Sequence, residues 1–435
     1  MNHQRTKEDV VDNRATNVIS LFAACLIQIA LFDSLFTLNG NKADDGGFGR
    51  QILWGGLGLT AMVYIAIDAV LQRDSRISFG GWPVFVLLVY VFSSTMWSVT
   101  PESTLKRCVI FLFVILLASI AVGSRSESWN SDEFSRSIGM PVALLIGLSM
   151  LLTIFVPGRV FTDIGWRGIA GQKNEAGQFL AIAILLLLYG IRTARVPIYR
   201  RLALLLVCSL FFALAQSTTA LLGLAFSLII CEAVTLRSSL AHAGSWNAAL
   251  MGCLLMLCLA GFVSYQLNLI PESGDLYAQF LRTLGKSETL TGRTAIWNLV
   301  LGESRFHNSM IGGGYGGFWV GPQSISGYVR IGDGLYPGQA HNGYIDVYND
   351  LGYTGLAILF SILTVALYRI RQVFALRHPE AKLHLAIVLV CIVLNLGEST
   401  FFRNSQFMNI VFFMSFIRVF SIIKQAGTGR AREAM

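Results

Sequence analysis

The chain has 435 residues, of which 54% are hydrophobic and 13% charged, and its formal net charge is +8. A soluble domain carries about 25% charged residues, so this composition excludes a globule covered only by water. Lipid is expected to cover much of the surface.

Apolar runs of nearly 20 residues recur along the chain, and each is long enough to cross a hydrocarbon core of about 30 Å. The first 16 residues are polar, and the run after them lacks a small-residue cleavage site, which indicates a retained signal-anchor. We predict an all-α polytopic membrane protein with about twelve transmembrane helices. The predicted spans are 17–36, 51–71, 81–99, 105–122, 138–156, 175–192, 201–215, 218–235, 246–266, 352–369, 383–399 and 405–423.

The stretch 201–235 is too long for one ordinary span and short for two, and Gln216 to Thr219 form a polar break at its middle. Splitting the stretch there leaves most of the 33 Lys and Arg residues in inward loops, as the positive-inside rule requires when both termini are cytoplasmic. One merged span would place the basic cluster from Arg369 to Lys382 outside. The charge pattern therefore favours two spans.

These spans divide the chain into four regions. They are an N-terminal bundle of about nine spans (1–266), a large periplasmic loop with short helices (267–351), the last three spans (352–424) and a cytoplasmic tail (425–435). The seven cysteines lie in the apolar spans or at their ends, without metal-ligand spacing. We therefore expect the cysteines to be apolar packing residues, and we expect neither a disulfide framework nor a zinc site.

Several cations fall on the outward side, against the general bias. An anionic ligand at the outer face would explain them, and helix capping or pairing with lipid phosphates is the alternative. They are Lys42, Arg50, Lys106, Arg107, Arg159, Arg167, Lys173, Arg282, Lys286, Arg293, Arg305, Arg330 and Arg403.

The outward loop contains a helix signal over 292–303, which Thr291 or Ser287 would cap. Arg293, Trp297 and Val300 would share one face of this helix. A cation in the first turn opposes the helix dipole, so Arg293 is badly placed for helix stability and invites a functional interpretation.

Two further motifs follow in the loop. The run from Gly312 to Gly317 permits a tight backbone and close ligand approach, but it is neither a P-loop nor a dinucleotide fingerprint. Ala340-His341-Asn342-Gly343-Tyr344 precedes a helical stretch that leads into the tenth span. The imidazole of His341 would lie near the outer surface and can accept a proton at neutral pH; a capping role is the alternative.

Taken in order and spacing, six motifs resemble those of one family, the O-antigen ligase and Wzy-type polysaccharide polymerase superfamily, particularly its ExoQ-like exopolysaccharide polymerases. The motifs are Trp97 to Pro101 with Thr104 to Arg107; Trp166 to Gly177; Gln216 to Leu221; Thr291-Gly292-Arg293 with Trp297, followed by Gly312 to Trp319; Ala340 to Gly355; and Glu398-Ser399. The similarity runs along most of the chain.

The resemblance implies a GT-C-type membrane glycosyltransferase that uses a glycan on undecaprenyl diphosphate and needs no cofactor, metal or nucleotide sugar. It implies a bacterial inner-membrane location, a periplasmic active site, and contacts with membrane lipids, a chain-length regulator and a flippase; no nucleic-acid partner is predicted. The acceptor would be another repeat unit for a polymerase or the lipid A core for an O-antigen ligase. Thr218 stands where many members carry Arg or Lys, and Gln172 stands where His is common. The missing cation at Thr218 favours the polymerase.

A diphosphate leaving group needs countercharge, and the planar guanidinium of arginine binds phosphate oxygens bidentately. The predicted catalytic residues are therefore Arg167 and Arg293, with His341 accepting or orienting the acceptor hydroxyl and Glu398 holding His341 or that hydroxyl. The predicted substrate-binding residues are Lys173, Asn174, Lys106, Arg107, Asn342, Tyr315, Trp297, Glu398 and Arg403.

A lipid-linked sugar transporter or flippase is the alternative from another class. Major-facilitator transporters show two six-span halves joined by a long cytoplasmic loop, whereas the longest loop here is predicted outside, between spans nine and ten.

Overall fold

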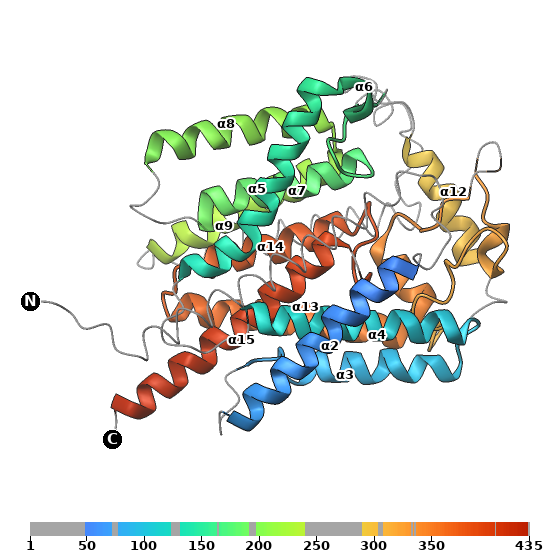
Figure 1. Cartoon of the computed structure of the whole chain (residues 1–435), viewed down its shortest axis with the longest axis horizontal. Helices are drawn as coiled ribbons and strands as arrows, with labels where there is room; N and C mark the ends of the chain where they lie inside the picture. The colour runs from blue at the N-terminus through green and yellow to red at the C-terminus, as the bar shows by residue number, and fades with distance from the viewer. Residues whose placement is uncertain are drawn as a thin grey trace, which may run out of the picture.

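The computed structural model describes residues 48–71, 77–122, 131–162, 165–190, 197–239, 289–302, 308–331, 334, 336–404 and 406–433. The predicted spans 17–36 and 246–266 lie outside these residues, as do loop residues 267–288 and 303–307. A helix coincides with each of the other ten predicted spans (Figure 1).

The elements follow one another as α2 (Phe48–Leu71), α3 (Trp82–Ser93), η2 (Ser94–Met96), α4 (Pro101–Val122), α5 (Ser131–Phe155), α6 (Pro157–Val160), β1 (Phe161–Thr162), β2 (Gly165–Trp166), α7 (Lys173–Leu185), the π-helical η3 (Leu186–Gly190), α8 (Ile198–Ala215), α9 (Thr218–Ser239), α12 (Thr289–Gly302), η5 (Ile325–Tyr328), α13 (Gly343–Ala375), α14 (Ala381–Leu394) and α15 (Phe407–Glu433). The two short strands pair antiparallel.

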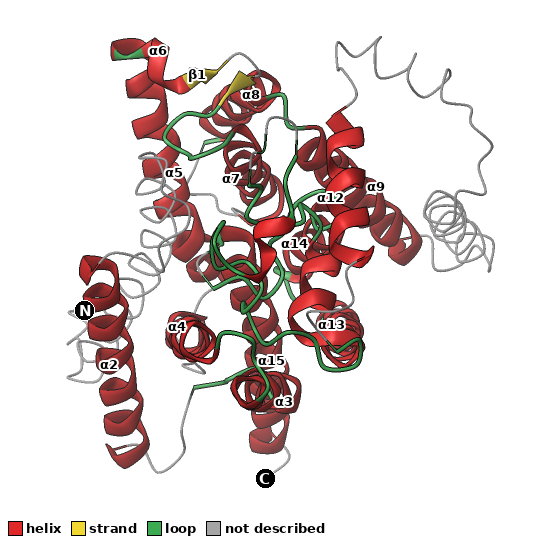
Figure 2. Cartoon of the chain, turned by 90° about the vertical axis from the view of Figure 1, so that its right-hand side faces the viewer, coloured by secondary structure: helices red, strands yellow, loops and turns green. Residues whose placement is uncertain are grey.

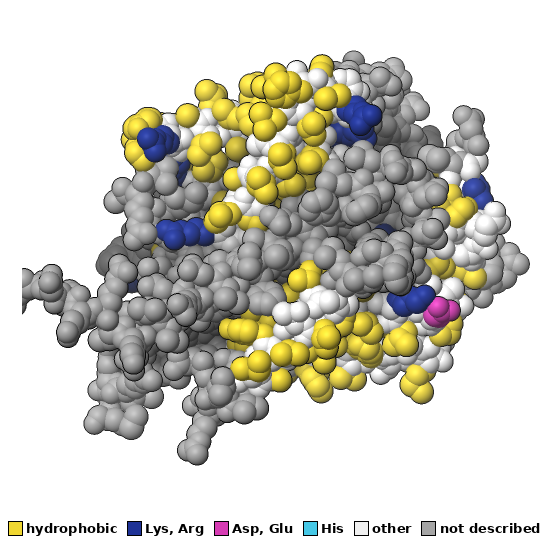
Figure 3. All heavy atoms as spheres, in the orientation of Figure 1, with side chains coloured by type: hydrophobic (Ala, Val, Ile, Leu, Met, Phe, Trp, Pro, Cys, Tyr) yellow, Lys and Arg dark blue, Asp and Glu magenta, His cyan; other side chains and the backbone are white. Residues whose placement is uncertain are grey.

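Six described helices are long and apolar enough to cross a membrane, within α4, α5, α8, α9, α13 and α15. Apolar side chains dominate the visible faces of α5 and α8 and of the group around α3 and α4, as a lipid-facing surface requires (Figure 3). The structure thus confirms the coarse prediction of a helical, polytopic membrane protein.

The predicted break within 201–235 is confirmed. Helix α8 ends at Ala215, and Gln216 adopts a left-handed conformation (φ 49°) before α9 begins at Thr218. A left-handed residue after the last helical turn is a common way to end a helix. The chain reverses there, and α7 packs against both α8 and α9.

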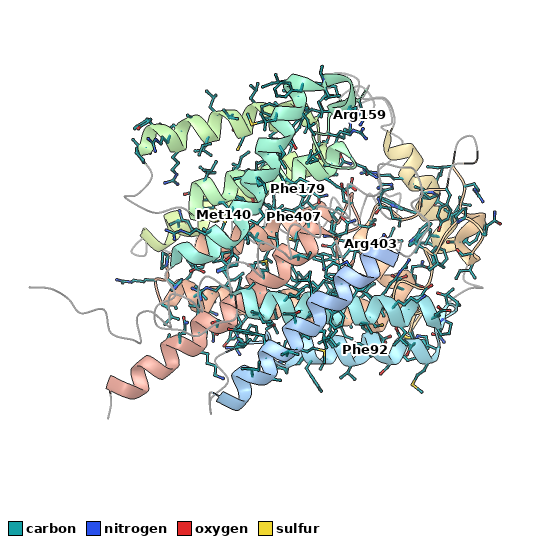
Figure 4. All side chains as sticks on the ribbon, viewed as in Figure 1. Phe92, Met140, Arg159, Phe179, Arg403 and Phe407 are labelled. Atoms are coloured by element: carbon teal, nitrogen blue, oxygen red, sulfur yellow. The ribbon has the colours of Figure 1, made fainter. Side chains whose placement is uncertain are left out.

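Helix α14 lies at the centre of the bundle and packs against α9, α13 and α15 (Figures 1 and 2). Almost all of its side chains are buried, and so are those of the first turns of α15. The rings of Phe179 and Phe407 meet edge to face in this interior, 4.7 Å apart (Figure 4). The last spans therefore form the core on which the remaining helices pack.

A buried ion cluster lies where α13 turns into α14. Both carboxylate oxygens of Glu380 accept hydrogen bonds of 2.9 Å from Arg418, and His384 lies 3.1 Å from the same carboxylate. All three side chains are at most 3% exposed. Burial raises the pKa of Glu380, but the charge of Arg418 and the hydrogen bonds with His384 and Arg418 outweigh this effect and lower it to about 2.

Several helix boundaries differ from the sequence-based prediction. Helix α12 begins at Thr289, three residues before the predicted start, so Arg293 lies beyond the first turn. The expected clash of Arg293 with the helix dipole is therefore wrong, because the dipole acts mainly within the first turn. Helix α15 continues to Glu433, past the predicted end of the last span at 423.

Helix α13 is interrupted at Gly352, whose backbone is non-helical (φ 66°, ψ −165°). At 33 residues, α13 is longer than the roughly 20 that cross a hydrocarbon core. The segment Gly343–Leu351 thus forms a separate short helix ahead of the expected span 352–369, at the end of the bundle where α12 and the irregular loops gather (Figure 2).

Candidate active site

Glu398 connects residues from three distant parts of the chain. Arg293 of α12 donates a hydrogen bond of 2.9 Å to its Oε1, and Asn174 of α7 donates one of 2.5 Å to the same oxygen. His341 Nδ1 lies 3.6 Å from Oε2. The carboxylate is 6% exposed and the His341 and Arg293 side chains are 22% and 23% exposed, so the group is sheltered but accessible.

Hydrogen bonds on both sides fix the backbone at His341. The indole of Trp297 donates to the carbonyl of Ala340 (2.8 Å), and the amide of Asn342 donates to Ser399 Oγ (3.0 Å). Asn342 also caps the following helix, because its side chain accepts from the amides of Tyr344 and Ile345. His341 itself has a left-handed backbone (φ 52°), which is uncommon for a residue with a side chain.

Gly343 allows the chain that follows His341 to approach Glu398 closely. Its amide donates to the carbonyls of Asn395 (2.9 Å) and Glu398 (3.0 Å). A Cβ at this position would lie 1.9 Å from the side-chain oxygen of Asn395, so any larger residue would push the two segments apart. The His-Asn motif and the late acidic motif are thus joined by a contact that requires glycine.

Beside this group lies a cavity of about 310 Å³, within the size range of small-molecule sites. Glu398 and Gln339, both neighbours of His341, belong to its lining, whereas Arg293 and His341 do not. Most of the lining is polar. It comprises Arg107, Ile110, Gly171, Gln172, Glu175, Gln178, Tyr315, Gly316, Trp319, Pro337, Gly338, Gln339, Asp350, Glu398, Ser399, Thr400, Phe402, Arg403, Asn404 and Gln406.

The glycine-rich segment 312–317 packs between the α3–α4 junction and α13. The amide of Val99 donates to the carbonyl of Gly313 (3.1 Å), and the amides of Gly313 and Gly314 donate to the carbonyls of Asn349 (3.0 Å) and Asp350 (2.9 Å). Gly312, Gly314 and Gly316 all have positive φ. Glycine tolerates these angles, which explains the composition of the run.

This segment holds Arg107 at the cavity. The guanidinium of Arg107 donates to the carbonyls of Gly316 and Trp319. Tyr315, which is buried, donates from its hydroxyl to the carbonyl of Phe402 (2.5 Å), and Asn404 donates to the carbonyl of Arg107 (2.9 Å). Burial places the pKa of Tyr315 well above its ordinary value, so its hydroxyl stays a donor at neutral pH.

Two carboxylates stand one turn apart on the short helix that begins α13. Asp346 is paired with Arg403 at 2.8 Å and accepts a hydrogen bond of 2.7 Å from the indole of Trp319. Asp350 lines the cavity, and within the described part of the chain its buried Oδ1 has no hydrogen-bond partner. Burial, reinforced by the charge of Asp346, raises the pKa of Asp350 to about 7, although Arg403 and Arg107 oppose the shift.

The structure brings most of the predicted site residues together. Arg293, Asn174 and His341 meet at Glu398, and Arg107, Tyr315, Glu398 and Arg403 line the cavity. Lys173 begins α7 near enough to Arg293 for their charges to repel. Figure 4 shows Arg403 at the end of the bundle that carries α12.

Four predicted residues have other surroundings. Arg167 donates to the carbonyl of Arg159 (2.9 and 3.0 Å) and does not line the cavity. Lys106 forms an exposed pair with Glu102 at 2.7 Å. Trp297 and Asn342 are buried and shape the backbone around His341. None of these four belongs to the lining of the cavity described above.

The sequence-based prediction missed Asp346, Asp350, Gln339 and Asn404. A signal for the first two was present, since they are four residues apart in a helical stretch and so share a face. Gln339 and Asn404 carry no such signal, because only the tertiary fold brings them to the cavity.

Residues 202–360 match the family model described as O-Antigen ligase. The chain also aligns with the exopolysaccharide production protein ExoQ of Rhizobium meliloti (strain 1021), with 22% identity over 295 residues, which are 66% of this chain and 64% of that protein. The resemblance to the O-antigen ligase family is confirmed. The chain thus covers just under two thirds of the length of this ExoQ.

The O-antigen ligase family is of the membrane glycosyltransferase and ligase type, and the relative is named for exopolysaccharide production. The matched segment contains Arg293, His341 and Asp350. Glu398 and Asn174, which complete the group, lie outside it.

Proposed function

We propose that this chain polymerises lipid-linked glycan repeat units, transferring a glycan from undecaprenyl diphosphate to a hydroxyl of another repeat unit. The observation that carries the proposal is the meeting of Arg293, His341 and Asn174 at Glu398, beside a polar cavity. It joins a cation suited to diphosphate, a proton acceptor and a carboxylate that orients both.

In the proposed reaction, the acceptor oxygen attacks the anomeric carbon while the bond from that carbon to the diphosphate oxygen breaks. His341 takes the proton of the acceptor hydroxyl through Nε2, since Gln339 Nε2 (3.0 Å) and Glu398 Oε2 (3.6 Å) both lie next to its Nδ1. Arg293 stabilises the negative charge that develops on the departing diphosphate. One well-placed donor of this kind contributes about 3–4 kcal/mol to transition-state stabilisation.

The test is polymer formation by purified protein in lipid nanodiscs supplied with an undecaprenyl-diphosphate-linked repeat unit. His341→Ala and Arg293→Ala are expected to abolish the ladder of long chains, whereas Glu232→Gln, which removes an exposed ion pair with Lys382, should leave it intact. Normal chain growth by His341→Ala at equal protein concentration would refute the assigned role.

An O-antigen ligase is the second candidate, favoured by the description of the matching family model. The chemistry would be the same and the acceptor would differ. Supplying lipid A core together with the lipid-linked glycan decides between the two. Glycan attached to the core, without longer free chains, would establish the ligase.

The proposed reaction requires the cavity to face the periplasm, with both termini in the cytoplasm. The charge distribution supports this orientation, because most Lys and Arg residues then lie in inward loops of the inner membrane. In this arrangement residues 1–266 form the first bundle, 267–351 the periplasmic loop and 352–424 the final spans, followed by the tail 425–435. A flippase would deliver the repeat units and a chain-length regulator would contact the same protein.

A further inference from the structure

We propose that the end of the cavity formed by Asp350 is the subsite for the acceptor glycan, where the Asp350 carboxylate receives hydrogen bonds from sugar hydroxyls. This inference rests on the proposed glycosyl transfer and assigns a role to a residue that the mechanism above does not use. It separates the cavity into a donor side at Glu398 and an acceptor side at Asp350.

The first argument is the state of the Asp350 carboxyl group. Its Oδ1 is buried and has no hydrogen-bond partner among the described residues, although the residue belongs to the cavity lining. A buried polar atom without a partner is unfavourable for the fold. Such an atom at a cavity wall is explained when a ligand completes its hydrogen bonds.

The second argument is that the surroundings hold Asp350 rigidly. Its carbonyl accepts from the amide of Gly314 (2.9 Å), and a Cβ on Gly312 would lie 2.4 Å from that carbonyl group. Gly352, two residues later, packs against the backbone of Met310 and Ile311 in the same way. The glycine-rich segment therefore clamps the helix end that carries Asp350, as a positioned binding group requires.

The third argument is the chemistry of the lining. The lining contains four side-chain amides, those of Gln172, Gln178, Asn404 and Gln406, together with the carboxyl group of Asp350. Amides and carboxylates together supply the donors and acceptors that a polyhydroxylated ligand needs. A carboxylate repels a diphosphate but attracts hydroxyl donors, so Asp350 suits the glycan of the acceptor and not the phosphate end of the donor.

The fourth argument is connection. Glu398 and Asp350 line the same cavity, and Glu398 is the carboxylate next to His341. A glycan bound at Asp350 would therefore share this cavity with the proposed catalytic group. Arg403, which also lines the cavity, is paired with Asp346 at 2.8 Å. This pairing offsets the charge of Arg403 within the cavity wall.

The experiment measures two reactions of the protein in nanodiscs. The first is transfer to a repeat unit carried on a polyprenyl monophosphate, which accepts a glycan but has no diphosphate to lose. The second is hydrolysis of the undecaprenyl-diphosphate-linked donor, in which water replaces the acceptor. Asp350→Asn is compared with Glu102→Gln, an exposed carboxylate on α4 paired with Lys106, as the matched control.

We expect Asp350→Asn to raise the KM for the monophosphate acceptor about 10-fold or more, the loss of a hydrogen bond to a charged group. Donor hydrolysis should stay near the wild-type rate, and Asp350→Glu should recover part of the acceptor affinity. An unchanged acceptor KM, or an equal fall in transfer and hydrolysis, would overturn the inference. If the wild-type protein neither transfers nor hydrolyses the donor, it is the proposed function that fails.

Thermal unfolding separates a binding role from a structural one. Asp350→Asn removes a buried charge whose Oδ1 has no hydrogen-bond partner among the described residues, so its melting temperature should equal or exceed that of the wild type at pH 8. A variant that binds the acceptor more weakly but is no less stable than the wild type would support a binding role for Asp350. A large fall in melting temperature would assign Asp350 to the fold and contradict the inference.

Discussion

Glu398 is the residue whose charge matters most at the candidate site, because Arg293, Asn174 and His341 all contact it. Glu398→Gln keeps the size of the side chain and removes its charge, so Arg293 loses its ion pair and His341 its anionic neighbour. We expect transfer to fall about 100-fold, the order seen when one charge-stabilising group is lost. Initial rates in nanodiscs measure this effect, and a fall of less than threefold would contradict it.

The stability of the protein should depend on Asp350 in a defined pH range. Its pKa is raised to about 7 in the folded state, whereas the pKa of an unfolded Asp is about 3.9. The folded state thus binds the proton more tightly, and the charged carboxylate destabilises the fold progressively as pH rises from about 4 to about 7. The gain in melting temperature from Asp350→Asn should accordingly be larger at pH 8 than at pH 5, and an equal gain at both would be inconsistent.

At the residue scale, the sequence predicted the members of the site better than their roles. Arg293, His341 and Glu398 were predicted from local motifs, and they meet in space. Arg167 was predicted by the same reasoning about arginine and phosphate, but its guanidinium binds the carbonyl of Arg159. Local sequence shows which groups are chemically suited, whereas their neighbours depend on packing between segments far apart in the chain.

Among the elements, the glycine-rich segment should be the most sensitive to small substitutions. Gly316 has φ 62°, and a Cβ there would lie 2.6 Å from the Arg107 side chain. Gly316→Ala should therefore displace Arg107 and destabilise the fold by about 1–2 kcal/mol, the cost of a left-handed residue with a side chain. Gly334→Ala is the matched control, since Gly334 also has positive φ (86°) but no described atom lies within 4 Å of an added Cβ. Equal losses of transfer in the two variants would argue against a role for the Arg107 contact.

The α13–α14 turn depends on its buried ion cluster. Glu380→Gln leaves Arg418 buried without its carboxylate partner, which should destabilise the protein by about 3–5 kcal/mol. Glu232→Gln, at an exposed carboxylate paired with Lys382, should cost at most about 1 kcal/mol. Thermal unfolding at pH 7 in one detergent compares the two variants, and similar melting temperatures would disprove the importance of the cluster.

The same cluster sets a pH dependence of opposite sign to that of Asp350. The pKa of Glu380 is lowered to about 2, below the usual value of about 4.3 for an unfolded Glu. Its stabilising contribution is therefore complete above about pH 5 and is lost as pH falls toward 2.

At this scale, apolar run length was sufficient to locate the helices, because a membrane-crossing segment needs about 20 apolar residues. The helix ends were predicted less well. Helix α12 begins at Thr289 although Thr291 and Ser287 offered equally good capping signals. The break at Gly352 depends on docking against Met310 and Ile311, which no local pattern reveals.

For the whole molecule, the predicted orientation is directly testable with single cysteines. In a variant without the seven native cysteines, Met96→Cys, at a position that is 87% exposed, should react with an impermeant maleimide added outside intact spheroplasts. Arg371→Cys, at an exposed position near the C-terminal end of α13, should react only after the membrane is opened. The reverse pattern would invert the proposed topology and place the cavity in the cytoplasm.

The meeting at Glu398 also has a consequence for biosynthesis. Asn174 is separated from Glu398 by 224 positions along the chain, and Arg293 by 105. A ribosome must therefore deliver nearly the entire polypeptide to the insertion machinery before the first of these side chains finds its partner. The nascent protein remains without its completed site until its final helices enter the bilayer, so premature termination yields an inert fragment and not a partially active enzyme.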